Sequence, residues 1–318
     1  MAVTTDPFVA ADLAAWIPEI WTPMILEELF APSAAASWFT DLSEDARGGG
    51  DILHVADIYT NTFTAQTQST QGAEVTTAGP AQTDVTLTIN THRYVAYIIG
   101  DKDRVQLLQS YPFNEVYTRK SAGVLRTALE DDLFGLWSGL TTNSVGDTAT
   151  VTSDAEIRTA IELLEALNFN TLDGNVAWFF HPYTFYIQLG AVQKYYDQSQ
   201  RGPLSAAGFV QTGTFDEMDI RRGLKGTLYG IPLFVSSRVV SGLQTYRNLL
   251  AHKSAFGFAT QYLQNPGSTT PEERVRAQSS YELRNIGWLS VIDMISGVVE
   301  LRDQAAVVVN GSSAFIGS

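Results

Sequence analysis

The chain contains no cysteine, which excludes disulfide frameworks, thiolate metal sites and cysteine nucleophiles. Charged residues are also scarce: they make up 17% of the 318 residues, a low share for a monomer that must keep its whole surface in water. Specific assemblies bury surface that is poor in charge. The scarcity of charge therefore favours a protein that functions in contact with partners.

Cations are the rarer of the two charge signs. The chain has 20 Lys and Arg against 34 Asp and Glu, which gives a formal net charge of −14. Affinity for nucleic acid comes largely from Lys and Arg that neutralise phosphates, so tight binding of DNA is disfavoured. If the protein encloses DNA, we expect confinement without sequence-specific binding. The acidity is explained equally well as an aid to solubility.

No hydrophobic run reaches the roughly 18 residues that a membrane span needs. The first residues also lack the basic region and apolar stretch of a signal peptide. Apolar residues nevertheless make up 45% of the chain, a globular composition that suffices for one large domain or two ordinary ones. The sequence thus predicts no membrane partner.

Catalytic signatures are missing as well. The sequence has no phosphate-binding loop, no dinucleotide-binding glycine pattern, no nucleophile elbow and no zinc-protease motif. We interpret Gly48–Gly50 as a hinge, because no helix with phosphate-binding side chains follows it. We therefore predict no cofactor, no metal site and no catalytic residue. Four histidines are scattered without a metal-ligand partner nearby in the sequence: His54, His92, His181 and His252.

Three consecutive carboxylates, Glu130–Asp132, could imitate a metal-binding cluster. Consecutive side chains on a helix point in different directions, so we interpret these residues as part of a solvated or intersubunit face. Acidic residues are plentiful, and a glycosidase-type pair of carboxylates that folding brings together stays open as an alternative.

The segment before the glycine hinge is apolar and interrupted by proline. We expect an extended start to this segment, because a proline biases the residue before it away from the helix. The residues concerned include Trp16, Ile17, Pro18 and Trp21. A short helix is predicted over residues 23–30. A segment with so little regular structure does not bury its own apolar side chains. It is either a strap over its own core or an arm that lies across a neighbouring subunit.

Two strand-like runs flank a long polar stretch. Residues 52–59 favour a strand, and residues 60–84 are mostly Thr, Gln, Ala and Gly without any Lys or Arg. From residue 85 apolar and polar side chains alternate toward residue 97, which is the period of a strand. We predict an extended β-hairpin that projects from the body, with a flexible surface loop as the alternative.

Helical and strand signals then alternate. Apolar residues from 113 to 137 keep three- and four-residue spacing, which predicts one helix of about 25 residues and roughly 40 Å. Ser153 and Glu156 form a capping-box pattern that begins a second helix. Val176–Phe180 is a buried-strand run, a further helix is predicted over residues 181–195, and the last third is rich in strands. The alternation of strand and helix predicts a mixed α/β domain within a chain whose overall fold class is α+β.

The order of these elements resembles the major capsid (coat) proteins of tailed bacteriophages. Their Hong Kong 97-type fold is shared with herpesvirus capsid floors and bacterial encapsulins. Two stretches carry the resemblance beyond element order: Ile17-Pro18-Glu19-Ile20-Trp21, and the run Gly226-Thr227-Leu228-Tyr229-Gly230-Ile231-Pro232-Leu233-Phe234-Val235-Ser236.

The resemblance implies a division of nearly the whole chain. The implied parts are an N-terminal arm (1–46), an extended loop (47–97), a peripheral domain with its spine helix (98–145), an axial domain (146–245), returning peripheral strands (246–303) and a C-terminal segment (304–318). A turn at residues 265–273 would then lie at the tip of the peripheral domain.

The resemblance also implies a function. The chain would be a virion protein, not an enzyme, that self-assembles in the host cytoplasm into pentamers and hexamers of an icosahedral head around double-stranded DNA. A portal and a decoration protein would be further partners. Residues that this reading makes candidates for assembly contacts are Trp16, Ile17, Pro18, Trp21, Glu74, Glu272, Arg274 and Arg276.

Two departures from the family bear on maturation. The chain has no Lys from Gly48 to Gly100, so we predict no isopeptide crosslink from the extended loop. The arm-like segment begins close to Met1, so we expect a separate scaffolding protein rather than a cleaved N-terminal one. Two other readings stay open: an encapsulin-type nanocompartment shell, and an acidic hydrolase that uses a carboxylate pair.

Overall fold

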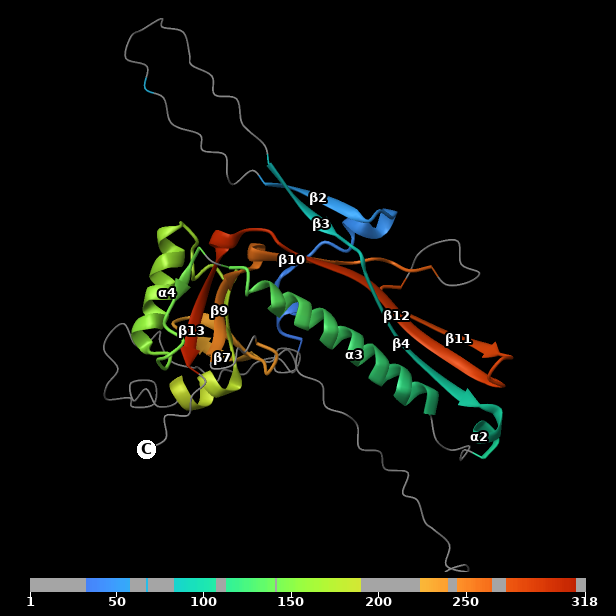
Figure 1. Ribbon diagram of the computed structural model, residues 1–318. Helices are drawn as coiled ribbons and strands as arrows, with labels where there is room; N and C mark the ends of the chain where they lie inside the picture. The colour runs from blue at the N-terminus through green and yellow to red at the C-terminus, as the bar shows by residue number, and fades with distance from the viewer. Residues whose placement is uncertain are drawn as a thin grey trace, which may run out of the picture.

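The computed structural model describes residues 33–57, 67, 83–106, 113–140, 142–189, 224–239, 245–264 and 273–312. Figure 1 shows two bodies side by side and a hairpin that projects from their junction. We call the part around a six-stranded sheet the compact body, and the part around a five-stranded sheet the elongated body. Both sheets draw strands from distant parts of the chain.

The compact body is built on a mixed sheet. Its strands, in spatial order, are β5 (Ser144–Val145), β13 (Ala306–Ser312), β9 (Thr245–His252), β6 (Val176–Phe180), β8 (Ile231–Val235) and β7 (Leu224–Leu228). All five residues of β6 are buried, which confirms the buried strand that its unbroken apolar run predicts. The sheet takes β9 and β13 from ranges that the sequence assigned to the returning strands and the C-terminal segment.

Local signals explain the edges of this body. Helix α4 (Asp154–Ala166), which packs against β13, begins with the predicted capping box: the Ser153 side chain accepts from Glu156 N, and the Glu156 side chain accepts from Ser153 N. β7 and β8 are joined by two residues with positive φ, Tyr229 at 56° and Gly230 at 78°. Positive φ at both positions is the type I′ turn that tight hairpins prefer.

The elongated body has the longest strand at its centre. β12 (Gly287–Glu300) pairs along one edge with β4 (Thr91–Gly100). Along its other edge it pairs first with β11 (Arg276–Glu282) and then with β10 (Phe256–Thr260), which in turn pairs with β1 (Thr40–Asp41).

Helix α3 (Phe113–Leu136) packs along one face of β12 and β4. Its 24 residues confirm the single long helix that the apolar spacing predicts. At about 1.5 Å per residue it spans roughly 36 Å. The short helix α2 (Asp101–Gln106) follows β4 at the far end of this body.

The projecting hairpin consists of β2 (Ile52–Asp57) and β3 (Thr83–Thr88), which pair antiparallel as predicted. The polar stretch between them lies outside the described residues. The alternation from residue 85 suggested one returning strand that continues toward residue 97, but the structure has two strands there. β3 ends at Thr88, and the chain re-forms as β4 within the other sheet. Gly297 of β12 makes this crossing possible, because a Cβ there would lie only 2.3 Å from Thr88 O.

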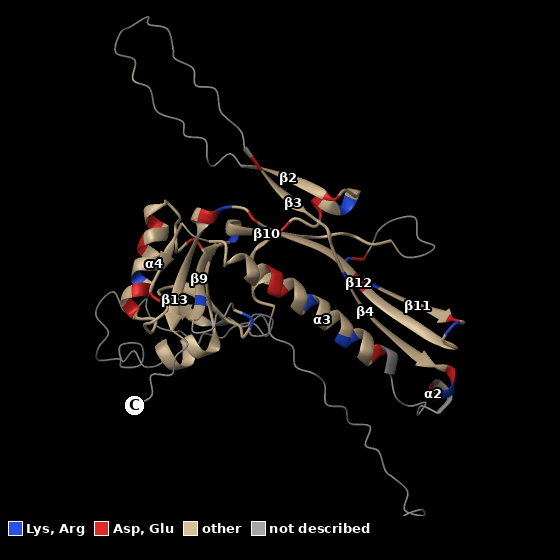
Figure 2. Cartoon of the chain, viewed as in Figure 1, with Lys and Arg blue, Asp and Glu red and all other residues tan. Residues whose placement is uncertain are grey.

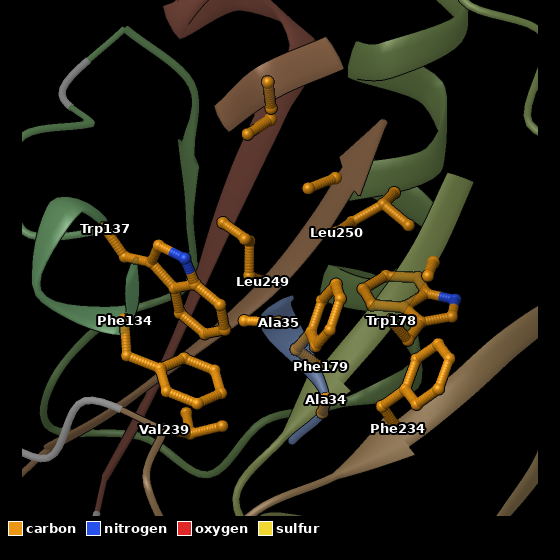
Figure 3. Close-up of a cluster of buried hydrophobic side chains, with 14 of the residues drawn as sticks. Ala34, Ala35, Phe134, Trp137, Trp178, Phe179, Phe234, Val239, Leu249 and Leu250 are labelled. Carbon is orange, nitrogen blue, oxygen red and sulfur yellow. The ribbon is translucent and has the colours of Figure 1, made fainter. Parts of the chain in front are cut away.

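One hydrophobic core joins the two bodies. Phe134 near the carboxyl end of α3 and Trp137 just after it meet edge to face, with ring centroids 4.5 Å apart, and the Trp137 ring centroid lies 5.6 Å from that of Phe179 on β6. Figure 3 shows these rings gathered around Ala35 of the short helix α1 (Ala35–Trp38). Burial of each large side chain contributes about 1.5–3 kcal/mol. The bodies therefore share one interior.

Two predicted helices lie partly or wholly outside the described residues. The one predicted over residues 181–195 is seen as a π-helical turn, η2 (Thr184–Gln188), pinned by Gln188, whose side chain donates to Ser312 O and accepts from Thr152 N. Residues 190–195 lie outside the described ranges, as does the short helix predicted over residues 23–30. Short 3-10 turns occur at η1 (Asp45–Gly48), η7 (Lys253–Ala255) and η8 (Asp303–Ala305).

Candidate assembly site

The histidines do not form a site in the part of the chain that the structure describes. Each lies on a different element and has its own partner: His54 with Asp84, His92 with Asp293, His181 stacked on Tyr246, and His252 with Ser254. Within the described ranges no three or more His, Asp or Glu side chains gather closely enough to hold a metal ion. Nor does any described helix have the length and hydrophobicity to cross a membrane.

The three carboxylates of α3 point apart, as consecutive residues on a helix must. Glu130 is buried, which corrects the interpretation that all three lie on a solvated or intersubunit face. Its carboxylate accepts from the backbone N–H of Ala35 at 2.6 Å and of Ala36 at 3.0 Å, and from the Ser33 hydroxyl at 3.3 Å. Burial raises the pKa of Glu130 even against these hydrogen bonds. Glu130 thus ties the described start of the chain to the spine of the fold.

Asp131 and Asp132 are held by separate cations. Asp131 pairs with Arg238 of the compact body, and Asp132 pairs in a two-pronged contact with Arg93 of β4. Both carboxylates line a cleft of about 340 Å³ between α3, β12 and the β3–β4 crossing. Asp131 and Asp132 are thus each paired with a separate cation, and Glu130 is bound by backbone N–H groups elsewhere. The three carboxylates therefore do not converge on one site.

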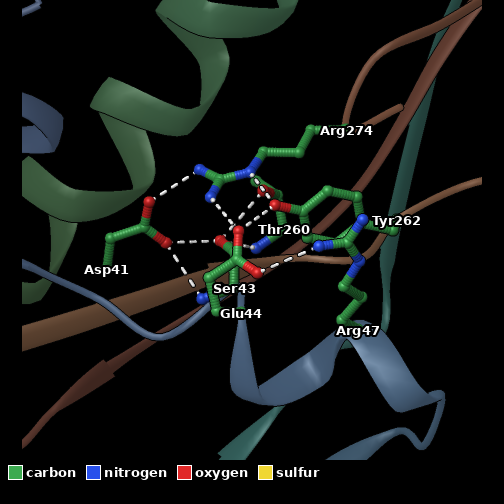
Figure 4. A network of polar contacts seen from close by, with 7 residues as sticks. All are labelled: Asp41, Ser43, Glu44, Arg47, Thr260, Tyr262 and Arg274. Atoms are coloured by element: carbon green, nitrogen blue, oxygen red, sulfur yellow. Dashed lines mark hydrogen bonds and ion pairs between the residues drawn. The ribbon is translucent and has the colours of Figure 1, made fainter. Parts of the chain in front are cut away.

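A polar network fixes the base of the hairpin to the elongated body (Figure 4). The Arg274 guanidinium donates to Asp41 at 2.6 Å and to the Tyr262 hydroxyl at 3.1 Å. Tyr262 donates to Glu44, and the guanidinium carbons of Arg47 and Arg274 lie 5.0 and 5.3 Å from the Tyr262 ring centroid. The network therefore links the segment that leads into the hairpin with the two ends of the connection between β10 and β11.

Ser43 extends the network into the sheet. Its hydroxyl contacts Asp41 Oδ1 at 2.5 Å and accepts from Thr260 N at 2.9 Å. Burial alone would raise the pKa of Asp41, but hydrogen bonds from Ser43 and the ion pair with Arg274 together lower it. Half-exposed pairs such as Arg274–Asp41 contribute about 0–1 kcal/mol each, so the role of the network is mainly to set geometry. Gly49 and Gly50, at φ 87° and 117°, then let the chain turn into β2.

A second charged group crosses the outer face of the elongated sheet. Arg276 of β11 donates to both oxygens of Asp293 on β12, at 3.0 and 2.6 Å, and His92 of β4 lies 3.0 Å from the same carboxylate. Burial alone would raise the pKa of Asp293, but hydrogen bonds from Arg276 and His92 hold it below its ordinary value. One buried carboxylate thus joins three neighbouring strands.

Of the candidate assembly residues, only Arg274 and Arg276 lie within the described ranges, and both guanidinium groups are engaged in ion pairs within the chain. Their part in contacts between subunits stays a prediction. The other candidates lie outside the described residues: Trp16, Ile17, Pro18, Trp21, Glu74 and Glu272.

The sequence did not predict a set of exposed apolar side chains that lies at the far end of the elongated body. We call Tyr281, Leu283, Ile286 and Trp288 the tip patch. They flank the β11–β12 turn, and the rings of Tyr281 and Trp288 meet at 5.8 Å. β11 ends at Glu282, so Leu283 lies in the turn. The sequence offered no signal that these side chains face solvent.

Solved structures with this fold include phage capsids. The chain aligns with one from Mycobacterium phage Che8 at a TM-score of 0.67 and 19% identity, covering 92% of this chain and 97% of the other. The capsid of cyanophage P-SCSP1u gives a TM-score of 0.67 at 12% identity, with 97% and 96% covered. The capsid of Ralstonia phage GP4 gives 0.63 at 13% identity, with 99% and 100% covered.

No protein-family model matches the sequence, and no curated protein matches it. The likeness is therefore one of fold, and it extends over nearly the full length of both chains in each comparison. The chain has the α+β fold of phage capsid proteins, which confirms the Hong Kong 97-type fold predicted from the order of its elements.

Proposed function

We propose that this chain is a major capsid protein, structural rather than enzymatic, that self-assembles into pentamers and hexamers of an icosahedral phage head. The observation that carries the proposal is the match in fold to capsid chains over nearly their whole length. A match over nearly the full length of both aligned chains favours the same architectural role. The match in fold to capsid chains also disfavours the acidic-hydrolase alternative.

In this proposal the compact body takes the axial role at the centre of each capsomer, and the elongated body the peripheral role. The hairpin would overlap an adjacent subunit. Its support is the half-buried apolar pair of Val55 and Val85, which lie opposite each other farther out on the ribbon than Leu53 and Leu87, the pair that packs on the body. A ribbon of two strands is marginal in water without a surface to pack on. The N-terminal arm would lie across a neighbour in the same way.

The acidic composition bears on the contents of the shell. With a net charge of −14, the chain is suited to enclose double-stranded DNA by confinement without sequence-specific contacts. A separate scaffolding protein and a portal would guide assembly in the host cytoplasm, with a decoration protein as a further partner. Each contact need contribute only a few kcal/mol, because closure multiplies many weak interfaces.

The test is negative-stain electron microscopy of the purified chain, expressed with and without its neighbouring genes. Uniform shells tens of nanometres across are the expected result. A discrete monomer or dimer in both preparations would overturn the proposal. Shells that hold a cargo enzyme instead of DNA would favour the encapsulin alternative.

A matched variant tests the role of the hairpin. Deletion of residues 60–84, which also removes the first two residues of β3, should weaken assembly while the subunit stays folded, because the core residues that the structure describes lie outside this range. Circular dichroism of the subunit is the control. Normal shell yield from the deletion would refute the overlap of hairpins.

A further inference from the structure

We propose that Glu130 is a proton-linked latch: it holds α1 in the shared core while its carboxyl is protonated, and it releases α1 to pair with Arg126 when it ionises. The latch lies where the start of the described chain meets the carboxyl-terminal half of α3. The inference goes beyond the proposed shell, because it concerns the single subunit. Its test therefore needs no assembled particle.

The first argument is the set of contacts around Glu130, which is only 2% exposed. Its Oε1 accepts from Ala35 N at 2.6 Å, and its Oε2 lies 3.0 Å from Ala36 N and 3.3 Å from the Ser33 hydroxyl. A neutral carboxyl can fill the same three contacts, because its O–H can donate to Ser33 while its oxygens accept from the two N–H groups. The site therefore holds Glu130 equally well without its charge.

The second argument is the cost of a charge in this place. Burial raises the pKa of Glu130 above the ordinary 4.5 of a glutamic acid, and the hydrogen bonds from the start of the chain only partly offset the effect. Removal from water favours the neutral form of an acid, and α1 brings no charged side chain that would reverse this. While α1 is docked, Glu130 therefore keeps its proton to a higher pH than an exposed glutamic acid does.

The third argument is that the ionised carboxylate has another partner at hand. Acidic and basic residues follow one another along α3 (Figure 2), and Arg126 lies four residues before Glu130, the spacing at which helical side chains meet. Both residues line a narrow gap together with Ser33 and Arg238. Arg238 is already paired with Asp131, whereas Arg126 has no ion pair with any described residue. Once Ser33 and α1 move away, the attraction of Arg126 favours the ionised form.

The position of α1 makes its release consequential. It has four residues and contributes no strand to either sheet, and short segments of this kind open locally without global unfolding. The ring of Phe39, directly after α1, lies 5.3 Å from that of Phe179 in the compact body and 5.0 Å from that of Phe256 in the elongated body. Ionisation of Glu130 would thus loosen the start of the chain and the contact between the two bodies together.

Hydrogen exchange of the unassembled subunit tests the latch. Because the folded-state pKa of Glu130 is raised, docking of α1 is strongest below the ordinary 4.5 and weakens as pH rises through the folded value. The exchange protection of residues 33–39, relative to the rate of the unstructured peptide, should therefore fall between pH 4.5 and about pH 8. The fall should reach about tenfold per pH unit above the folded pKa, as the release of one proton requires. Glu130→Gln, which does not ionise, should show constant protection over this range.

Two further variants separate a latch from a carboxylate with a structural role alone. Glu300→Gln removes another carboxyl whose pKa burial raises, at the end of β12, and should keep the pH dependence of the parent. Arg126→Gln removes the partner of the released carboxylate and should move the fall in protection to higher pH. Constant protection in the parent, or the same pH dependence in Glu130→Gln, would overturn the latch, and an unshifted curve for Arg126→Gln would overturn the exchange of partners. All of these outcomes leave the proposed shell standing.

Discussion

Gly297 lies where β3 crosses β12, and a methyl group there has no room. A Cβ would stand 2.3 Å from Thr88 O and 3.0 Å from the Cα of Ile89, so backbone rather than a flexible side chain blocks it. To reach an ordinary contact of 3.4 Å, the crossing strand must move by about 1 Å. β3 is held by its ladder with β2, and β12 by its ladder with β4. We expect Gly297→Ala to lower the free energy of unfolding by about 1–3 kcal/mol.

Gly135 provides the control, because it lines the same cleft. It lies in α3, where a Cβ would meet nothing within 4 Å. Alanine in place of glycine at such a helical position restricts the unfolded chain and should raise the free energy of unfolding by about 1 kcal/mol. The two variants each add one methyl group to one cleft, yet their stabilities should differ by about 2–4 kcal/mol.

Urea unfolding of the dissociated subunit, followed by circular dichroism, measures both variants against the parent. The expected order of midpoints is Gly135→Ala, parent, Gly297→Ala. Shell yield should drop for Gly297→Ala alone, since the displaced crossing redirects the hairpin. Equal midpoints for the two variants would refute the close contact between β3 and β12.

Three further predictions concern single polar groups. Glu130→Ala should cost about 2–4 kcal/mol of unfolding free energy, because it strips the acceptor from Ala35 N and its neighbour; an unchanged urea midpoint would contradict this. Asp293→Asn should cost about 2 kcal/mol near pH 7 through loss of the charged contact with Arg276, measured in the same way. The folded-state pKa of Asp293 lies below its ordinary 3.8, so its contribution is complete above that pH and is lost as pH falls through the folded value. The acid unfolding curve of this variant should accordingly be flatter below about pH 4, and an identical curve would count against the linkage. Ser153→Ala should lower thermal stability by about 1 kcal/mol through loss of the α4 cap, whereas no change would show that the cap is dispensable.

Elements with local signals could be predicted from the sequence. The periodicity of α3, the capping box of α4 and the unbroken apolar run of β6 each lie within a short stretch of chain, and each is seen in the structure. The turn between β7 and β8 belongs to the same class, because its Tyr-Gly pair adopts the positive φ that a tight hairpin needs. Such features depend on neighbours along the chain, so spacing and residue type suffice.

Features that depend on distant partners could not be predicted. The pairing of β4 with β12 joins residues about 200 positions apart, and no pattern in either strand names the other. Glu130 was expected at a solvated or intersubunit face, but its burial depends on N–H groups 95 residues earlier, which no helical pattern reveals. The tip patch was missed for the opposite reason: apolar residues in a strand pattern suggest burial, and only the structure shows that these four side chains are partly or largely exposed.

The continuity of β12 has a mechanical consequence. One strand runs from the tip turn to the junction of the two bodies. At about 3.3 Å per residue, its 14 residues form a lever arm of roughly 46 Å. With α3 braced along it, this arm is stiff, so a rotation of about 5° at the junction displaces the tip by about 4 Å. Small differences in repacking near the shared core are thereby amplified at the far end. In the proposed shell, a single chain could in this way meet neighbours at more than one angle without unfolding any of its parts.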